Sequence, residues 1–210
     1  MMQNKKTQRK NKQMRQSMAH NQRFALLASH GEILFHAGDV ATLWKIQGRN
    51  TLYKTLSRYA AQGLIVRIHK GFYSLKSPFD IDPYLLGVKA LHRPAYISCE
   101  SVLFNEGILN QVPAEITVVS SVSKRYGIAG KQFRSRKMRE GFLMNDAGIE
   151  VKNGVRTATV PRAIADMLYF NPAKYFDAHT SGLVDWKAVT DIARKIGYTV
   201  HIPNGKMKKI

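Results

Sequence analysis

The chain has 210 residues and is strongly basic, with 33 Lys and Arg against 14 Asp and Glu, a net charge of +19 and a pI near 10.2. A surplus of this size attracts polyanions, so nucleic acid or an acidic protein is the expected kind of partner. No run approaches the length of about 18 apolar residues that a membrane span needs, and no secretory signal follows the N-terminus. The single cysteine, Cys99, excludes an intrachain disulfide and argues against a cysteine-based zinc site, so a cytoplasmic protein is expected.

The positive charge is densest near the N-terminus. Residues 1–75 hold 13 Lys and Arg against two acids, a net charge of +11, whereas residues 76–210 carry +8. Residues 1–17 are basic and have almost nothing to bury, so a disordered arm is predicted there. Such an arm adds salt-dependent affinity for DNA phosphates, or it serves only as a solubilising tail.

The segments after this arm predict the start of a winged helix-turn-helix. Residues 23–29 are predicted to form a helix, 33–35 a short strand and 39–46 a second helix, with Gly48 at the turn into a third. Together with the third helix and a hairpin, they make residues 18–76 a compact DNA-binding domain.

The third helix, between Gly48 and Gly63, follows an amphipathic spacing. Leu52, Leu56 and Tyr59 fall at i, i+4 and i+7, so they are predicted to point into a core. The other face has no acid and carries small hydrogen-bonding groups between cations, which suits entry into a DNA major groove about 12 Å wide. A merely solvated face is the alternative. The residues predicted to contact bases are Arg49, Asn50, Thr51, Lys54, Ser57 and Arg58.

A short hairpin is predicted after this helix. The runs 64–68 and 72–75 are rich in β-branched and aromatic residues, and Gly71 separates them at a tight basic tip. The hairpin would then be a wing beside the recognition helix. The wing residues predicted to meet phosphate or a minor groove are Arg67, His69 and Lys70.

A mixed α/β domain is predicted over residues 80–200, and a basic tail over residues 201–210. The boundary is expected in residues 76–80, and Asp82 and Pro83 mark the start of a helix. The expected fold class is therefore α+β, with an N-terminal winged helix-turn-helix before the α/β domain. The predicted strands are 95–97, 115–121, 131–138, 149–152 and 155–158, with Asn153-Gly154 as a hairpin turn between the last two. Further helices are predicted after Ser98, which is expected to cap its helix, after Pro161, and from Asp185 to Gly197.

A series of short motifs occurs in a fixed order after the hairpin pattern Lys70-Gly71-Phe72-Tyr73. These motifs are Tyr96-Ile97-Ser98, Ser101, Leu103, Gly107-Ile108-Leu109, the strands 115–121 and 131–138, and Pro161-Arg162-Ala163-Ile164-Ala165-Asp166. In this order the chain, from about residue 20 to 170, resembles the AbiEi-type antitoxins of type IV toxin–antitoxin systems and their transcriptional-regulator relatives. The resemblance implies a winged helix that binds inverted repeats in its own promoter. It also implies a C-terminal domain that counteracts a nucleotidyltransferase-like toxin.

The sequence contains no set of residues typical of an enzyme active site. The chain lacks a GxxxxGK[ST] loop, an HExxH motif and a GxSxG motif, so no catalytic residue, cofactor or metal ligand is predicted. Asp80 and Asp82 have the spacing of a metal pair in nucleotidyltransferases, but helix capping before Pro83 explains Asp82 more simply. Cys99 lies between an apolar strand and a helix start and is predicted to be a small buried thiol.

A second group of cations lies between residues 124 and 139 with no acid among them. On a strand, Arg134 and Arg136 are predicted to share one face, and Phe133 and Ser135 the other. Such a patch would bind a polyanion or an acidic toxin surface; the alternative is an edge strand that its charges keep from aggregating. The residues of this basic cluster are Lys124, Arg125, Lys131, Arg134, Arg136, Lys137 and Arg139.

The sequence thus predicts a DNA-binding transcriptional autoregulator and antitoxin without catalysis, with double-stranded DNA and a toxin protein as partners. The alternative is a basic RNA-binding or ribosome-associated protein, which would be expected to expose aromatic rings for stacking. Tyr59, Phe72 and Tyr73, near the basic helix, are instead predicted to face the core.

Overall fold

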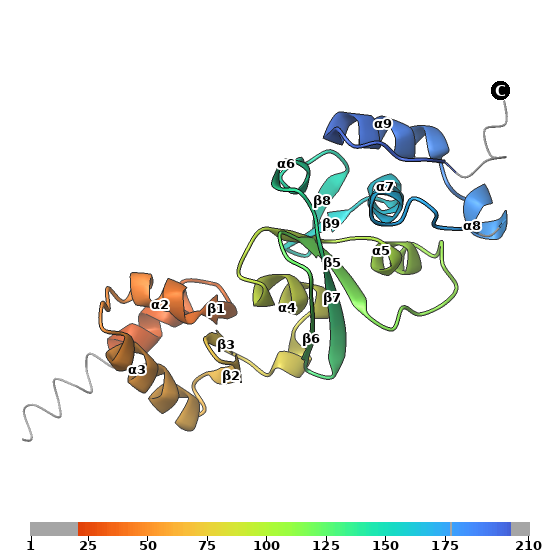
Figure 1. Ribbon diagram of the computed structural model, residues 1–210. Coiled ribbons are helices and arrows are strands. Elements are labelled where there is room, and N and C mark those ends of the chain that lie inside the picture. The colour runs from red at the N-terminus through yellow and green to blue at the C-terminus, as the bar shows by residue number, and fades with distance from the viewer. Residues whose placement is uncertain (1–20, 177, 203–210) are drawn as a thin grey trace, which may run out of the picture. The chain divides into compact units, whose positions relative to one another are not determined.

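The computed structural model describes residues 21–176 and 178–202, which form a mixed α+β fold with two sheets (Figure 1). The chain divides into two compact units, residues 1–80 and residues 81–210. The predicted arm, residues 1–17, and most of the predicted tail lie outside the described residues. Within the described ranges, no helix is both long and apolar enough to cross a membrane.

Unit 1 combines helices with a three-stranded antiparallel sheet in the order β1-β3-β2. Its first described segment, residues 21–29, is helical. The elements that follow are β1 (Leu34–His36), α2 (Ala37–Leu43), α3 (Arg49–Ala61), β2 (Val66–His69) and β3 (Phe72–Ser74). Each of these elements was predicted, but α2 ends three residues earlier than expected and β2 starts two residues later. α2 also starts two residues earlier, because Asp39 lies inside the first turn, where its carboxylate accepts a hydrogen bond from the His36 amide at 3.2 Å.

The core of unit 1 is built around Tyr59 on α3. Its ring packs edge-on against Phe24 at 5.9 Å and against Trp44 at 5.6 Å. Leu52, Leu56 and Tyr59 are all buried, which confirms the predicted inner face of α3. Burial of this stripe, rather than helix propensity, is the main source of stability for such a helix.

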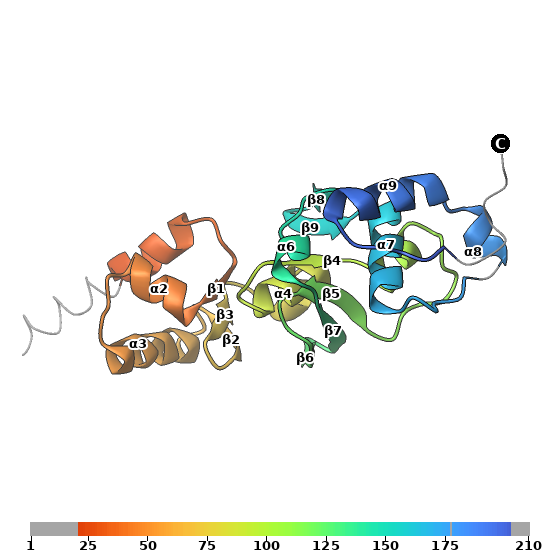
Figure 2. The same ribbon diagram turned by 45° about the horizontal axis from the view of Figure 1, so that its top comes forward.

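Unit 2 is built on a six-stranded mixed sheet with the strand order β6-β7-β5-β4-β9-β8 (Figure 2). The pairs β5–β7 and β4–β9 are parallel and the other pairs are antiparallel. The strands are β4 (Ala95–Ile97), β5 (Ile116–Ser120), β6 (Lys124–Ile128), β7 (Lys131–Lys137), β8 (Ile149–Lys152) and β9 (Val155–Ala158). The helices are α4 (Pro83–Ala90), α5 (Glu100–Asn105), α6 (Glu140–Leu143), α7 (Val160–Phe170), α8 (Ala178–Gly182) and α9 (Trp186–Ile196).

Helices cover both faces of this sheet. On one face, the Tyr126 hydroxyl donates to the Gly87 carbonyl of α4 at 2.8 Å, and Gly87 lies so close to Phe133 that an added Cβ would be 2.4 Å from its ring. On the other face, Phe170 of α7 lies 5.2 Å from the Arg136 guanidinium. Because residues 133 and 136 differ in parity along β7, α4 and α7 must lie on opposite faces of the sheet.

Two helix N-caps of unit 2 were predicted correctly. Asp82 caps α4 by accepting from the Tyr84 amide at 2.7 Å, and Asp185 caps α9 by accepting from the Ala188 amide at 3.0 Å. The strands β4, β8 and β9 have the predicted bounds. The prediction that Ser98 caps α5 is wrong, because Cys99 occupies that position with φ of 58° and the Ser98 hydroxyl turns to another partner. The elements β6, α6 and α8 were not predicted.

Candidate functional site

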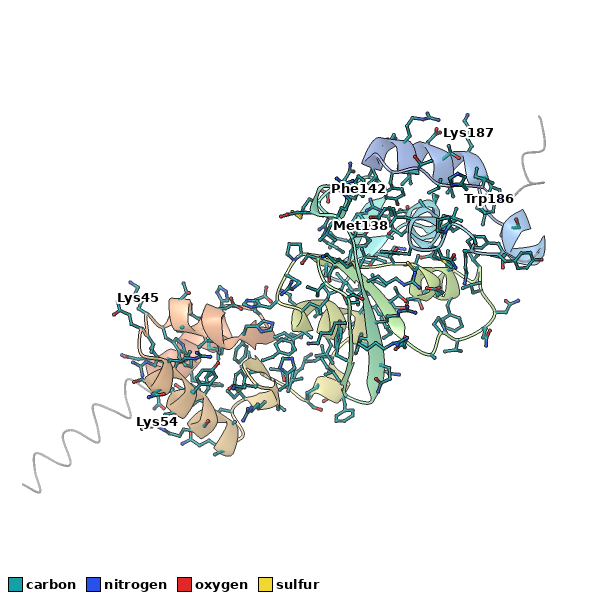
Figure 3. All side chains as sticks on the ribbon, viewed as in Figure 1. Lys45, Lys54, Met138, Phe142, Trp186 and Lys187 are labelled. Carbon is teal, nitrogen blue, oxygen red and sulfur yellow. The ribbon has the colours of Figure 1, made fainter. Side chains whose placement is uncertain are left out.

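The outward face of α3 is exposed along its length. All six residues predicted to contact bases are exposed, and Arg49–Ala61 contains no acid, so no carboxylate within the helix neutralises its cations. Figure 3 shows Lys54 projecting from the side of α3 that faces away from α2. The structure therefore places these six side chains on one accessible, positively charged surface.

The β2–β3 hairpin lies beside α3 within unit 1. Its tip is Lys70-Gly71, where Gly71 adopts φ of 83°, a conformation that favours glycine. An added Cβ at Gly71 would lie 3.6 Å from the Tyr53 hydroxyl of α3, so the helix and the hairpin tip are neighbours. Arg67, His69 and Lys70 are exposed. The helix and hairpin cations thus belong to one basic surface, defined here as the α3–hairpin surface.

The aromatic residues of this region do not form a stacking platform. Tyr59 and Phe72 are fully buried and Tyr73 is 2% exposed, which confirms that these three rings face the core. The His36 ring stacks on Phe72 at 4.5 Å. The α3–hairpin surface therefore presents cations to solvent, with Tyr53 as its half-buried aromatic residue.

The basic cluster in unit 2 is divided between the two faces of the sheet. Arg125 of β6 lies directly opposite Arg134 of β7, and Arg136 follows on the same face. Lys124 lies opposite Ser135, on the other face, which Lys137 shares by alternation along β7. Every member of the cluster is exposed except Arg136, which is half-buried.

Several of these cations are held by contacts within the chain. Arg125 forms an ion pair with Glu115 at 2.8 Å, and Arg139 lies 5.1 Å from the Phe142 ring. The Nε of Arg136 is buried without a hydrogen-bond partner. The cluster is thus a set of local contacts around an edge strand rather than one continuous binding face.

A buried ion pair, Arg162 with Asp166, organises the core of unit 2. Both side chains have 0% exposure, and Arg162 Nε donates to Asp166 at 3.0 Å. The same carboxylate accepts from the Ser98 hydroxyl at 2.7 Å, the Tyr96 hydroxyl at 3.0 Å and the Tyr198 hydroxyl at 2.7 Å. Four donors therefore converge on one buried carboxylate.

The remaining donors of Arg162 tie α7 to the segment before β8. Nη1 donates to the carbonyls of Asn145 at 3.1 Å and Ala147 at 2.8 Å. Nη2 donates to the Phe142 carbonyl at 3.2 Å and to the Tyr96 hydroxyl at 2.7 Å. Since a guanidinium has five N–H donors, this one is fully satisfied without water.

The protonation states of this network follow from its burial. Burial raises the pKa of the Asp166 carboxyl, while the Arg162 guanidinium and the hydroxyl donors act against that rise. Burial and the nearby Asp166 carboxylate raise the pKa of Tyr96 and Tyr198, so both hydroxyls keep their protons and donate. The network is thus a set of buried side chains that hydrogen-bond one another in the interior of unit 2.

This network joins two of the motifs that carry the family resemblance. Tyr96 and Ser98 belong to the first of these motifs, and Arg162 and Asp166 belong to the last. Ser98 and Asp166, which are hydrogen-bonded, are 68 residues apart in the chain. The contact between the two motifs was not predicted from the sequence. The available signal was the pair of opposite charges at i, i+4 within an otherwise apolar helix, which is typical of a buried ion pair.

Two of the three residues considered for chemistry, Cys99 and Asp82, have structural roles. Cys99 is fully buried, as predicted, and burial raises the pKa of its thiol well above the ordinary value. Asp82 caps α4. Among the described residues, no group of three or more His, Cys, Asp or Glu side chains is placed to hold a metal ion.

Unit 2 also contains a cleft that the sequence did not suggest. Its volume is about 690 Å³, and its lining includes Ser101 and Asn105 of α5 and Lys131 and Gln132 of β7. Much of its charge is paired, since Lys152 contacts Glu106 at 2.7 Å.

A scan against protein-family models gives no match, and a comparison with curated proteins also finds none. Among solved structures, the chain is similar to the RV2827C protein from Mycobacterium tuberculosis. The two share 13% identity over 83% of this chain and 76% of that chain, with a TM-score of 0.41. A likeness at this level assigns neither a fold family nor a function.

Proposed function

We propose that the protein is a DNA-binding transcriptional regulator that acts without catalysis on its own promoter. The observation that carries the proposal is the α3–hairpin surface, in which an acid-free, exposed helix face lies beside a basic glycine-tipped hairpin. The helix enters the major groove, and the hairpin contacts phosphate or a minor groove. An α-helix with its side chains is about 10–12 Å across, which matches a groove about 12 Å wide.

The order of elements in unit 1 supports this proposal. Helix, strand, helix, helix, strand, strand is the succession that a winged helix-turn-helix requires, with α3 as the recognition helix and β2–β3 as the wing. The exposed residues are also of the types that read DNA. Asn bonds adenine and Arg bonds guanine in the major groove, and both types lie near the N-terminal half of α3 as Asn50 and Arg49.

Binding to the DNA upstream of the gene tests this function. Fluorescence anisotropy of the full chain is expected to show a specific site bound about 10³-fold or more tightly than random duplex of equal length. Affinity for both duplexes should fall steeply with salt, because phosphate contacts release counterions. Equal affinity for promoter and random DNA would refute a sequence-specific regulator. Better competition by structured RNA than by duplex at the same salt would favour the RNA-binding alternative.

We further propose that the protein is an antitoxin in the cytoplasm and that unit 2 counteracts a nucleotidyltransferase-like toxin. The support is the resemblance carried by residues 96–109 and 161–166. Because residues 96, 98, 162 and 166 form a buried network, they shape unit 2 and cannot themselves touch a toxin. The contacting surface must therefore consist of other, exposed residues of the unit.

Co-expression tests the antitoxin role. A nucleotidyltransferase-like protein encoded next to this gene is expected to arrest growth alone, and the full chain is expected to restore growth. An Asn50→Ala, Arg58→Ala double variant should restore growth equally well, because it alters only the α3–hairpin surface. Growth arrest that the wild-type chain cannot relieve would refute the antitoxin role and leave the DNA-binding proposal intact.

A further inference from the structure

β8 is the outermost strand at one edge of the sheet, and the main-chain groups on its outer side face no neighbouring strand among the described residues. The Thr159 amide donates to the Gly148 carbonyl at 2.8 Å, so residues 148 and 159 form a hydrogen-bonded pair. Because such pairs alternate along an antiparallel ladder, the main-chain groups of Glu150 and Lys152 bond β9. The N–H and C=O groups of Val151 therefore point outward, along the free edge of the sheet.

The side chains around this edge are accessible. Val151 is 70% exposed, and the side chains of Glu150 and Lys152 are 55% and 48% exposed. Beyond β8, the described part of the chain places no further strand. An unpaired edge with an exposed valine at its centre is a template for another strand.

The sequence of β8 is complementary to itself. If two copies pair antiparallel about Val151, the register places Glu150 of one copy opposite Lys152 of the other, twice by symmetry. Each Lys152 already contacts Glu106 of its own copy at 2.7 Å and gains a second carboxylate from the partner copy. Val151 then meets Val151 on the opposite face, and its amide and carbonyl exchange two hydrogen bonds with the second copy. Opposite charges facing each other across strands stabilise a pair, and like charges destabilise it.

The other edge of the sheet lacks this complementarity. β6 carries Lys124 and Arg125, both exposed, and no acid. Two copies that approach through β6 could place no acid of that strand opposite its cations, and charged side chains are a common protection of an edge strand. The contrast between the two edges indicates that β8 is the one suited to self-pairing.

We propose that β8 is a self-association surface through which two copies of the chain pair antiparallel about Val151. The paired sheets form one continuous sheet of two units. Pairing of four residues buries less than the roughly 1,200 Å² of a typical stable interface, so the dimer of the free protein is weak. Its detection therefore calls for covalent trapping. The proposal does not depend on DNA binding, and its failure would leave the proposed function untouched.

A Val151→Cys variant traps this dimer. In a hydrogen-bonded antiparallel pair the Cα atoms are about 5.5 Å apart, within the range that a disulfide spans. Oxidised glutathione accepts the two electrons and two protons of the thiols and leaves as two reduced molecules. The matched control is Val112→Cys, because Val112 is also 70% exposed. The native Cys99 is buried and does not compete.

Cross-linking at position 151 is expected to be about tenfold or more faster than at position 112, because pairing raises the encounter of the two thiols. Adding Glu150→Lys or Lys152→Glu to Val151→Cys should bring the rate down to that of the control. A mixture of these two charge variants should regain the fast rate. In the heterodimer, the two lysines of one copy, at positions 150 and 152, lie opposite the two glutamates of the other. Equal rates at positions 151 and 112, or charge variants without effect, would overturn the proposal.

Discussion

Replacing Arg162 by Met is expected to destabilise unit 2 by about 3–5 kcal/mol, because it leaves the Asp166 carboxylate buried without its cation. The substitution also removes every donor that ties α7 to the carbonyls before β8. Hydrogen–deuterium exchange measures the effect by region. The free energy of opening measured at the amides of β4 and α7 should fall by about 3–5 kcal/mol. The exchange of the α3 amides in unit 1 should be unchanged.

The matched control is a surface ion pair in the same unit. Asp191 and Arg194 lie 3.2 Å apart on α9, with side-chain exposures of 41% and 75%. Because water screens such a pair, Asp191→Asn is expected to cost less than about 1 kcal/mol. A loss for Arg162→Met no larger than that of Asp191→Asn would show that the buried network does not hold the unit together.

On the DNA site bound by the wild-type chain, Asn50→Ala and Arg58→Ala are each expected to cost about 1–3 kcal/mol of binding free energy. The loss on random duplex should be smaller, because base contacts distinguish sequences and phosphate contacts do not. Lys70→Ala at the hairpin tip should instead weaken both DNAs alike and reduce the salt slope by about 1. Anisotropy titrations at several salt concentrations separate these outcomes.

Lys187→Ala provides the control for charge alone, because it removes one exposed cation from α9 in unit 2. Its effect on either DNA should be small. If all of these variants, Lys187→Ala included, weakened operator and random DNA equally, α3 would not be the element that reads bases.

The sequence predicted best where local chemistry decides the structure. Asn153-Gly154 indicated the β8–β9 hairpin, and both residues adopt the positive φ values of such a turn, 51° and 76°. Asp185 and Gly197 likewise marked the ends of α9, where they serve as N-cap and C-cap. The outward face of α3 followed from helical periodicity alone, since its inner stripe of leucines fixed which side chains remain exposed.

Features that depend on distant partners were not predictable in the same way. No strand was predicted at β6, because its sequence begins with two cations and lacks a clear alternation, but β7 provides a partner strand that places Arg125 opposite Arg134. Ser98 looked like a helix cap, yet its hydroxyl binds a carboxylate 68 residues away in the chain. Such contacts are set by tertiary packing, which no local pattern encodes.

The closed network of Tyr96, Ser98, Arg162 and Asp166 has a practical consequence for tracing relatives. These four side chains meet in the interior, so a search pattern built on their spacing would collect chains that share the scaffold of unit 2. Such a pattern would carry no information on what those chains recognise, because none of the four side chains reaches solvent. Grouping such chains by their targets would require comparing the outward positions of α3 and the bare edge of β8 instead.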